Sequence, residues 1–269
     1  MIHPEGYLFA TLIGLSLGMI GGGGSVLTVP VLVYIMGISP LLSTSYSLFI
    51  VGVTSLVGAM QYAKNKLVDY KTGLLFGLPS IIAVYTTRKF LVPMIPEHVL
   101  SIGSLDITKQ VFVMALFALL MIMASISMIL PTKEKSTHKN YTGGLFYLSV
   151  ILEGVLVGGL TGLVGAGGGF LIIPALVLLA GLPMKLAVGT SLLIIALKSL
   201  IGFTGDMGHY TLDWSTLLLF TAFAIIGMFA GTALSKKVSG AKLKPAFGWF
   251  VLVMGIFILV NEIFLKTIK

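Results

Sequence analysis

The sequence predicts an all-α polytopic membrane protein made of two inverted repeats of about five hydrophobic segments each. The first observation is composition: 57% of the 269 residues are hydrophobic, 10% are charged and the mean hydropathy is +1.08, far from the balance of a soluble domain. The second is an internal repeat, and the third is the distribution of charges between hydrophobic segments. The period-two alternation of outer-membrane barrels is missing, so the segments are expected to be helices.

The repeat is clearest at two glycine runs, GMIGGGGS at 18–25 and GLVGAGGG at 162–169, each followed by a proline, Pro30 or Pro174. Sliding the sequence on itself by 144 residues keeps 23 of the 65 positions from Leu12 to Phe76 identical. Chance does not give such a match even in a chain rich in Gly and Leu. In an apolar protein, duplicated halves with a glycine break at matching places indicate a transporter binding site.

Ten hydrophobic segments fill the chain, and they divide it into a first membrane repeat (1–130), a cytoplasmic linker (131–141) and a second membrane repeat (142–269). The first segment has repeat partners in the second half and no basic region before it, so we expect it in the mature fold and not as a signal peptide. The segments are 7–20, 26–36, 48–63, 73–85, 111–130, 145–164, 170–180, 186–203, 217–234 and 247–260.

Lysines in the short connections predict the topology, because cytoplasmic loops are rich in Lys and Arg. The linker and the connection 64–71 each carry three lysines, and 236–244 carries four, so all three are predicted to be cytoplasmic. The counterpart of 64–71 in the second half, 204–213, has two aspartates and a histidine but no Lys or Arg, which places it outside. Equivalent loops on opposite sides require inverted repeats, with an odd number of crossings in each half.

Arg88 and Lys89 then fall near the outer end of the fourth segment, against the charge rule. We interpret both as long side chains that snorkel to the membrane interface, with a functional role as the alternative.

The second segment of each half is too short to cross a bilayer. From Gly24 to Gly37 a helix would measure roughly 20 Å, against a hydrocarbon core of about 30 Å. Either five crossings or three crossings plus a re-entrant pair give the odd number required. Non-helical backbone at membrane depth survives only where it is buried in protein or lines a cavity, so we expect the short, glycine-broken helices near the membrane middle to face an internal site.

The glycine runs are candidate anion-binding loops. Glycine permits positive φ and close approach of a ligand, Ser25 is positioned to cap the following helix, and a helix N-terminus attracts anions. Two such ends related by an inverted axis would point at one central anion. The alternative is that the glycines only allow helices to pack closely.

Polar side chains repeat along the third segment of each half. Spacings of seven residues align Ser47, Thr54 and Gln61 on one helical face, and Ser191 with Lys198 on the equivalent face. Such hydroxyls often only bond to the preceding turn or join two helices, whereas a stripe repeated in both halves favours a lined pathway.

Lys198 lies deep in a hydrophobic segment, where a charge costs at least about 2.5 to 3.5 kcal/mol on insertion scales. It either attracts a substrate anion or is neutralised by Glu153, and Glu153 is equally a candidate proton carrier. The repeated Asp69 and Asp213 lie at segment starts, where a carboxylate caps a helix.

Several function classes are disfavoured. The formal charge of +8 resides in topology-setting loops, so nucleic acid is not an expected partner. The chain has no cysteine, HExxH or G-x-S-x-G motif, and its four histidines lie at ends or in loops. We therefore expect neither an enzyme nor a metal site or cofactor.

The paired glycine runs, the prolines beyond them and the serine-rich or Gly-Thr-Ser start of the third segment resemble the TauE/SafE sulfite exporter family, also called the toluene sulfonate uptake permeases. The resemblance covers essentially the whole chain. It implies a multi-pass permease of a prokaryotic plasma membrane that moves small sulfur-containing or carboxylate anions, with export favoured by the family resemblance alone. An anion channel, a carboxylate or sulfonate uptake permease, and a structural or sensing subunit are the alternatives.

We expect an alternating-access transporter of sulfite or an organosulfonate, with proton coupling through Glu153 as a further hypothesis. The expected substrate-binding residues are Gly22, Gly23, Gly24, Ser25, Thr44, Ser45, Ser47, Gln61, Gly167, Gly168, Gly169, Thr190, Ser191 and Lys198.

Overall fold

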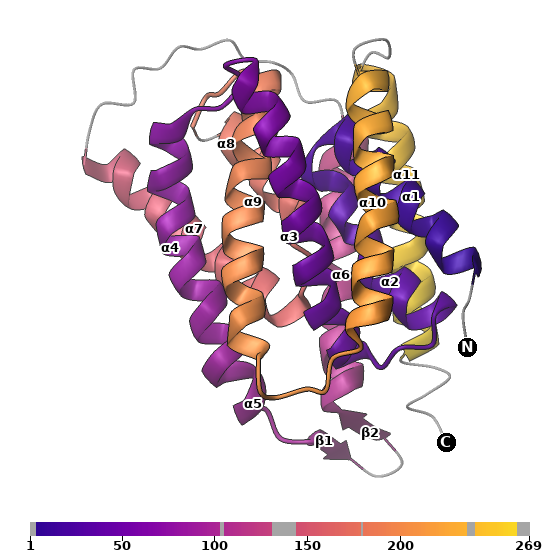
Figure 1. Cartoon of the computed structure of the whole chain (residues 1–269). Helices are drawn as coiled ribbons and strands as arrows, with labels where there is room; N and C mark the ends of the chain where they lie inside the picture. The colour runs from indigo at the N-terminus through magenta and orange to yellow at the C-terminus, as the bar shows by residue number, and fades with distance from the viewer. Residues whose placement is uncertain (1–3, 103–104, 131–143, 179, 236–239, 263–269) are drawn as a thin grey trace.

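A computed structural model describes residues 4–102, 105–130, 144–178, 180–235 and 240–262 of the chain. The described part is almost entirely helical, as the sequence predicted (Figure 1). The first half contains α1 (Pro4–Ile20), a 3-10 turn (Gly22–Leu27), α2 (Thr28–Pro30), a π turn (Val31–Ile35), α3 (Pro40–Lys64), α4 (Tyr70–Thr86), a second π turn (Thr87–Leu91), α5 (Val92–Met94), and α6 (Lys109–Ile129). The second half contains α7 (Gly144–Val164), α8 (Gly169–Leu178), α9 (Met184–Asp206), α10 (Trp214–Ser235) and α11 (Gly240–Val260).

Among the described residues, five helices are long and apolar enough to cross a membrane, namely α3, α4 with its extension to Met94, α6, α9 and α10. Shorter apolar helices in the described part of the chain are Glu5–Ile20, Gly24–Ile35, Leu148–Val164 and Gly248–Val260. Large apolar side chains line the outward faces, for example Leu74, Leu78 and Ile82 at successive turns of α4. A face of this kind suits contact with lipid, so the chain is a multi-pass membrane protein.

The two halves exchange their packing partners. α1 packs on α10 and α7 packs on α4, while α3 lies against α9 and α6 against α11. Glycines permit the two exchanged contacts: a Cβ on Gly14 would overlap the Ala224 carbonyl of α10, and one on the equivalent Gly158 would lie 2.5 Å from the Ser80 carbonyl of α4. Small residues therefore bring these helix backbones into close contact.

The helices of the two halves can be compared by the direction in which they run along the bundle. α3 ends and α9 begins at one end of the molecule, which we call the Lys64 end; the opposite end, where α3 begins and α9 ends, is the Asp206 end (Figure 1). α1 runs parallel to α10 and starts from the Asp206 end, whereas α7 runs parallel to α4 and starts from the Lys64 end. Equivalent helices thus run in opposite directions, as inverted repeats require.

The linker 131–141 and the lysines of 236–239 lie outside the described residues. The division into a 1–130 repeat and a 142–269 repeat stays a prediction from the sequence, because the packing exchange joins both halves into one bundle.

The sequence did not predict an antiparallel hairpin, β1 (His98–Ile102) and β2 (Leu105–Thr108), between α5 and α6 at the Asp206 end (Figure 1). The Glu97 carbonyl accepts a hydrogen bond from the Lys109 amide at 2.8 Å and joins the base of the hairpin to α6.

Candidate functional site

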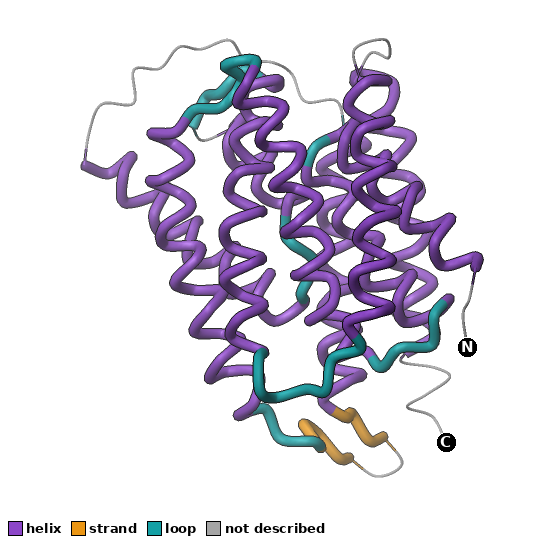
Figure 2. Tube along the Cα trace, viewed as in Figure 1, coloured by secondary structure: helices purple, strands orange, loops and turns teal. Residues whose placement is uncertain are grey.

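The two glycine runs touch at the centre of the bundle. A Cβ added to Gly22 would overlap the Cα of Gly169, and a Cβ added to Gly169 would overlap Gly22, so the backbones meet with no room for side chains. Gly167 lies against Val51 of α3 and Ile195 of α9, which are near the middle of these two long helices. Figure 2 shows the second break as a short loop segment surrounded by helices. We call this contact the glycine crossing.

The second run needs glycine for its conformation as well as for space. Gly165, Gly167 and Gly168 have φ of +72°, +65° and +71°, a region that L residues with side chains seldom adopt. α8 begins directly afterwards at Gly169, and the first amides of a helix have no partner within it. The run therefore presents amide groups and the positive end of a helix dipole to the crossing.

Lys198 lies against this run. A Cβ on Gly168 would be 2.8 Å from its Nζ and would overlap Thr161, so only glycine leaves space for the ammonium. Nζ donates a hydrogen bond to the Thr161 hydroxyl at 2.8 Å, and the Lys198 side chain is fully buried. In the first half the positions equivalent to Lys198 and Thr161 are Thr54 and Leu17. Of these equivalent positions, only that of Lys198 on α9 brings a positive charge to the crossing.

Hydroxyls surround the crossing one helical turn to either side. Ser47 and Ser191 come one turn before Val51 and Ile195, and Ser55 and Ser199 come one turn after them. All four are buried. The Ser191 hydroxyl donates to the Val188 carbonyl at 2.8 Å, whereas the Ser47, Ser55 and Ser199 hydroxyls have no hydrogen-bond partner among the described residues. Buried hydroxyls without partners are uncommon and leave donors for a ligand.

Ser25 does not cap a helix, contrary to our expectation. The 3-10 turn already begins at Gly22, so Ser25 lies inside it and donates its hydroxyl to the Gly22 carbonyl at 2.7 Å. Its buried side chain faces Gly167, with 3.4 Å between its Cβ and the place where a Cβ of Gly167 would be. Gly24 lies against Ser16 and Leu17 of α1, and Gly23 lies within the 3-10 turn.

Thr190 has a structural contact away from the crossing. Its hydroxyl accepts a hydrogen bond from the Asp69 amide at 2.9 Å, and the preceding Gly189 leaves space for the Leu67 carbonyl. The Gly-Thr-Ser sequence thus fixes the connection between α3 and α4 at the Lys64 end. At the equivalent position of the first half, the Tyr46 hydroxyl accepts from the Asp213 amide at 2.6 Å.

Thr44 and Ser45 lie near the Asp206 end of α3, where they are fully buried. The Thr44 hydroxyl donates to the Leu41 carbonyl at 2.7 Å and accepts from Arg88 Nη1 at 3.0 Å. Arg88 therefore does not snorkel: its side chain is buried, with 1% of its surface exposed, and it pairs with Asp206 at 3.3 Å. Lys89 is exposed as predicted and donates to the Tyr85 hydroxyl. The π turn at Thr87–Leu91 carries both residues.

Two predicted residues lie apart from the crossing. Gln61 follows Ser47 by 14 positions on α3, about 21 Å along a helix, so one small ion cannot touch both. Glu153 precedes Thr161 by eight positions on α7, about 12 Å along its axis. The described contacts include no ion pair between Lys198 and Glu153, so the geometry does not support neutralisation of Lys198 by Glu153.

The capping prediction for both repeated aspartates is confirmed. Asp69 accepts from the Lys71 and Thr72 amides, and Asp213 accepts from the Ser215 and Thr216 amides at 3.0 and 3.2 Å. The hydroxyl and amide of Thr216 donate to the Asp213 carboxylate and lower the pKa of this exposed group below its usual value.

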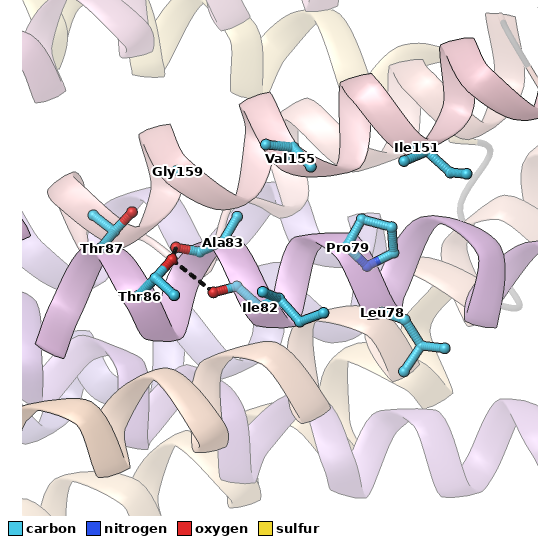
Figure 3. A pocket seen from close by; sticks show the side chains of 9 residues that line it. All are labelled: Leu78, Pro79, Ile82, Ala83, Thr86, Thr87, Ile151, Val155 and Gly159. Carbon is cyan, nitrogen blue, oxygen red and sulfur yellow. Dashed lines mark hydrogen bonds between the residues drawn. The ribbon is translucent and has the colours of Figure 1, made fainter. Parts of the chain in front are cut away.

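A groove of about 550 Å³ lies elsewhere, between α4 and α7 (Figure 3). Its walls are apolar side chains such as Leu78, Ile82 and Val155, and the Thr86 hydroxyl at one end donates to the Ile82 carbonyl. It opens on the lipid-facing side and has no charged lining residue, so it does not suit an anion. The described residues hold no group of three or more histidines and carboxylates that could bind a metal.

Sequence reasoning missed Thr161, Ser55, Ser199 and the Arg88–Asp206 pair. Ser55 and Ser199 are identical in the repeat, which was a usable signal. Asp206 was assigned to an outer loop, but it is the last residue of α9 and is buried. The sequence placed Arg88 and Asp206 on the same outer side, and their opposite charges could have indicated the ion pair.

Comparisons with known proteins agree with the helical membrane architecture. A family profile described as "Sulfite exporter TauE/SafE" matches residues 7–258. A probable membrane transporter protein of Xylella fastidiosa (strain Temecula1) is 28% identical over 253 residues, which covers 92% of this chain and 91% of that protein. The probable membrane transporter protein YunE of Bacillus subtilis is 29% identical over 262 residues, covering 86% and 89%. A probable membrane transporter protein of Methanocaldococcus jannaschii is 27% identical, covering 96% of both chains. No solved structure matches the chain significantly.

Proposed function

The chain belongs to the sulfite exporter TauE/SafE family of membrane transporters, and on this premise we propose that it is a secondary transporter that exports sulfite or a small organosulfonate across a prokaryotic plasma membrane. The observation that carries the proposal is the buried Lys198 ammonium, which lies at Gly168 of the glycine crossing.

A buried lysine needs a compensating interaction. An ammonium has three N–H donors, and the described contacts give Lys198 one partner, the Thr161 hydroxyl. A neutral hydroxyl does not balance a charge in an apolar interior, where an isolated ion is strongly disfavoured. A small anion between Lys198 and the amides of the second glycine run supplies the missing charge.

The surroundings suit an oxyanion that binds and leaves again. Ser47, Ser55 and Ser199 offer buried hydroxyls without partners, and the start of α8 offers amide groups. Hydroxyls and amides bind sulfite or sulfonate oxygens without the strength of a ring of arginines, which would retain the ion. We assign Gly167, Gly168, Gly169, Ser47, Ser191 and Lys198 to the site, together with Gly22, Gly23, Gly24 and Ser25 from the facing run.

Alternating access follows from the arrangement of the halves. Short hairpins from opposite ends meet at the glycine crossing, while α3 and α9 pass beside it in opposite directions. A site between two inverted units opens to one side or the other when one unit rocks against the other. Thr44 and Ser45 then line the approach from the Asp206 end, and Thr190 and Gln61 line the approach from the Lys64 end.

Glu153 is the proposed proton-coupling residue. It lies partly buried on α7, about 12 Å along the helix from Thr161, and its protonation would be linked to the position of α7 and not to direct contact with Lys198.

Flux measurements in liposomes test the proposal. Liposomes with the purified protein and internal sulfite should show saturable efflux that external sulfite accelerates by counter-transport, which a channel does not show. Lys198→Met should lower the flux at least tenfold, and Lys89→Met, which removes an exposed lysine, should leave it unchanged. A panel of sulfite, sulfate, thiosulfate, taurine, sulfoacetate and acetate in a thermal-shift assay identifies the preferred anion, because a ligand of the folded form raises its apparent stability. Absence of binding and flux for every anion of the panel would reject the function.

A further inference from the structure

A second buried cation lies at the other end of the same glycine run. Arg88 Nη1 donates to the Thr44 hydroxyl at 3.0 Å and to Asp206 Oδ2 at 3.3 Å. The side chains of Arg88 and Asp206 are 0% and 3% exposed. This cluster joins the π turn after α4, the start of α3 and the last residue of α9 at the Asp206 end.

Most of the guanidinium has no partner. An arginine carries five N–H donors, and those on Nε and Nη2 have no hydrogen-bond partner among the described residues. Leaving buried donors of a charged group unpaired is costly, so a structural arginine normally satisfies more of them. One oxygen of Asp206 accepts a hydrogen bond from one nitrogen, Nη1. The edge formed by Nε and Nη2, which can bind two oxygens of one anion, stays available.

The unpaired side of Arg88 faces the glycine run. Nη2 lies 2.5 Å from the place where a Cβ of Gly165 would be, so this glycine admits the guanidinium just as Gly168 admits Lys198. Gly165 and Gly168 are three residues apart, which limits their α-carbons to about 11 Å. Arg88 and Lys198 therefore lie at the two ends of one loop.

Within the described part of the chain, the equivalent positions of the other half do not repeat this pair. In the other half the positions equivalent to Arg88 and Asp206 are Thr232 and Tyr62. The Lys64 end therefore has no matching ion pair at these positions. An element needed only to hold the repeat together would be expected in both halves, whereas this one distinguishes the two entrances.

We propose that Arg88 is a direct ligand of the transported oxyanion at the Asp206 end, and that Asp206 on Nη1 competes with the anion for the positive charge of the guanidinium. With no anion at that entrance, Asp206 occupies Nη1. When the anion passes from Lys198 along the glycine run, two of its oxygens bind Nη2 and Nε, since the planar guanidinium fork matches an oxyanion bidentately. Asp206, which stays on Nη1, repels the bound anion and promotes its release outward. This inference rests on the proposed transport function and adds a gate to it.

Calorimetric titration of the purified protein with sulfite tests the gate. Asp206→Asn removes the competitor and should tighten sulfite binding at least threefold. The double variant Arg88→Gln with Asp206→Asn contains no unpaired buried charge at this place and should bind sulfite at least tenfold more weakly than wild type. Arg88→Lys keeps the charge without the fork and should fall between wild type and the double variant.

The results separate this gate from the transport function itself. If wild type binds sulfite and the double variant binds it within twofold of wild type, Arg88 is not a ligand and the gate is overturned while the function stands. Unchanged or weaker binding by folded Asp206→Asn overturns the competition. If Asp206→Asn does not fold, the double variant and Arg88→Lys decide. Absence of sulfite binding by wild type itself counts against the transport function and the gate together.

Discussion

Tyr46 and Thr190 occupy equivalent positions in the two halves and make the same contact with side chains of very different length. The Tyr46 hydroxyl accepts from the Asp213 amide at 2.6 Å, and the Thr190 hydroxyl accepts from the Asp69 amide at 2.9 Å. In both cases the bonded amide belongs to an aspartate of the other half, Asp213 at the start of α10 or Asp69 at the start of α4. The two halves therefore make the same contact although the residues at the equivalent positions differ.

Tyr46→Phe and Thr190→Val should each destabilise the protein by about 1 kcal/mol, because each removes the acceptor of a partly buried amide. Thermal unfolding in detergent measures the loss. Tyr85→Phe is the control, since the Tyr85 hydroxyl bonds to exposed Lys89 at the surface and should change little. Equal melting temperatures for Tyr46→Phe and wild type would contradict the structural role.

Asp213 should make stability depend on pH at acid values. Hydrogen bonds from Thr216 lower its pKa in the folded protein, below a value of about 3.9 for an unperturbed aspartate. A lowered folded-state pKa gives stability that is present above the unfolded pKa and is lost as pH falls through the folded pKa. Asp213→Asn still caps α10 but does not titrate. Its melting temperature should lie below that of wild type at pH 7 and converge with it at acid pH. A difference that stays constant with pH would contradict this explanation.

Gly168→Ala should abolish sulfite flux, because the added methyl group would collide with Thr161 and displace the Lys198 ammonium. Gly181→Ala is a matched control: Gly181 also has positive φ, +65°, but nothing lies within 4 Å of the place of its Cβ. Both variants have the same backbone strain, of order 1 kcal/mol. Flux in liposomes and melting temperature are measured for both. Equal loss of flux in the two variants would show that strain alone explains the effect.

Thr161→Val should destabilise the protein by roughly 1–3 kcal/mol, since it leaves the buried Lys198 ammonium without its hydroxyl partner. Thr161→Ser keeps the hydroxyl and should retain most of the stability. Sulfite should raise the melting temperature of Thr161→Val more than that of wild type, because the anion replaces the lost partner. A smaller shift in Thr161→Val would place the anion away from Lys198.

Hydropathy and the repeat predicted most of the fold. The predicted segments 186–203 and 217–234 correspond to α9 and α10, and their ends differ by a few residues because Pro183 and Asp213 begin the helices earlier than the apolar run. The hairpin β1–β2 could not be predicted in this way, since it lies outside the apolar segments and has no counterpart in the repeat. The packing exchange between halves was equally hidden, because periodicity locates a helix face but does not name the helix against which it packs.

For the site, sequence reasoning identified residues with an unusual backbone or an unusual environment. A glycine run and an intramembrane lysine stand out in the sequence, so Gly168 and Lys198 were predicted, and the structure brings them together. Arg88 was interpreted as snorkelling because a position near a segment end fits both a side chain that reaches the interface and a buried one. The sequence does not show the π turn that carries Arg88 and places it inside the protein. Thr190 was predicted to bind substrate because a hydroxyl on a helix does not reveal its partner.

The exchange of packing partners also has a consequence for synthesis. Gly14 of α1 packs on Ala224 of α10, and these residues are 210 positions apart in the chain. At a translation rate of about 5–20 residues per second, the ribosome makes the second partner roughly 10–40 s after the first. During this interval the helical hairpin of the nascent first half, α1 with α2, exposes its glycine face because α10 has not yet been made. The insertion machinery, or α3 and α6 of the same half, must shelter that hairpin until α10 emerges.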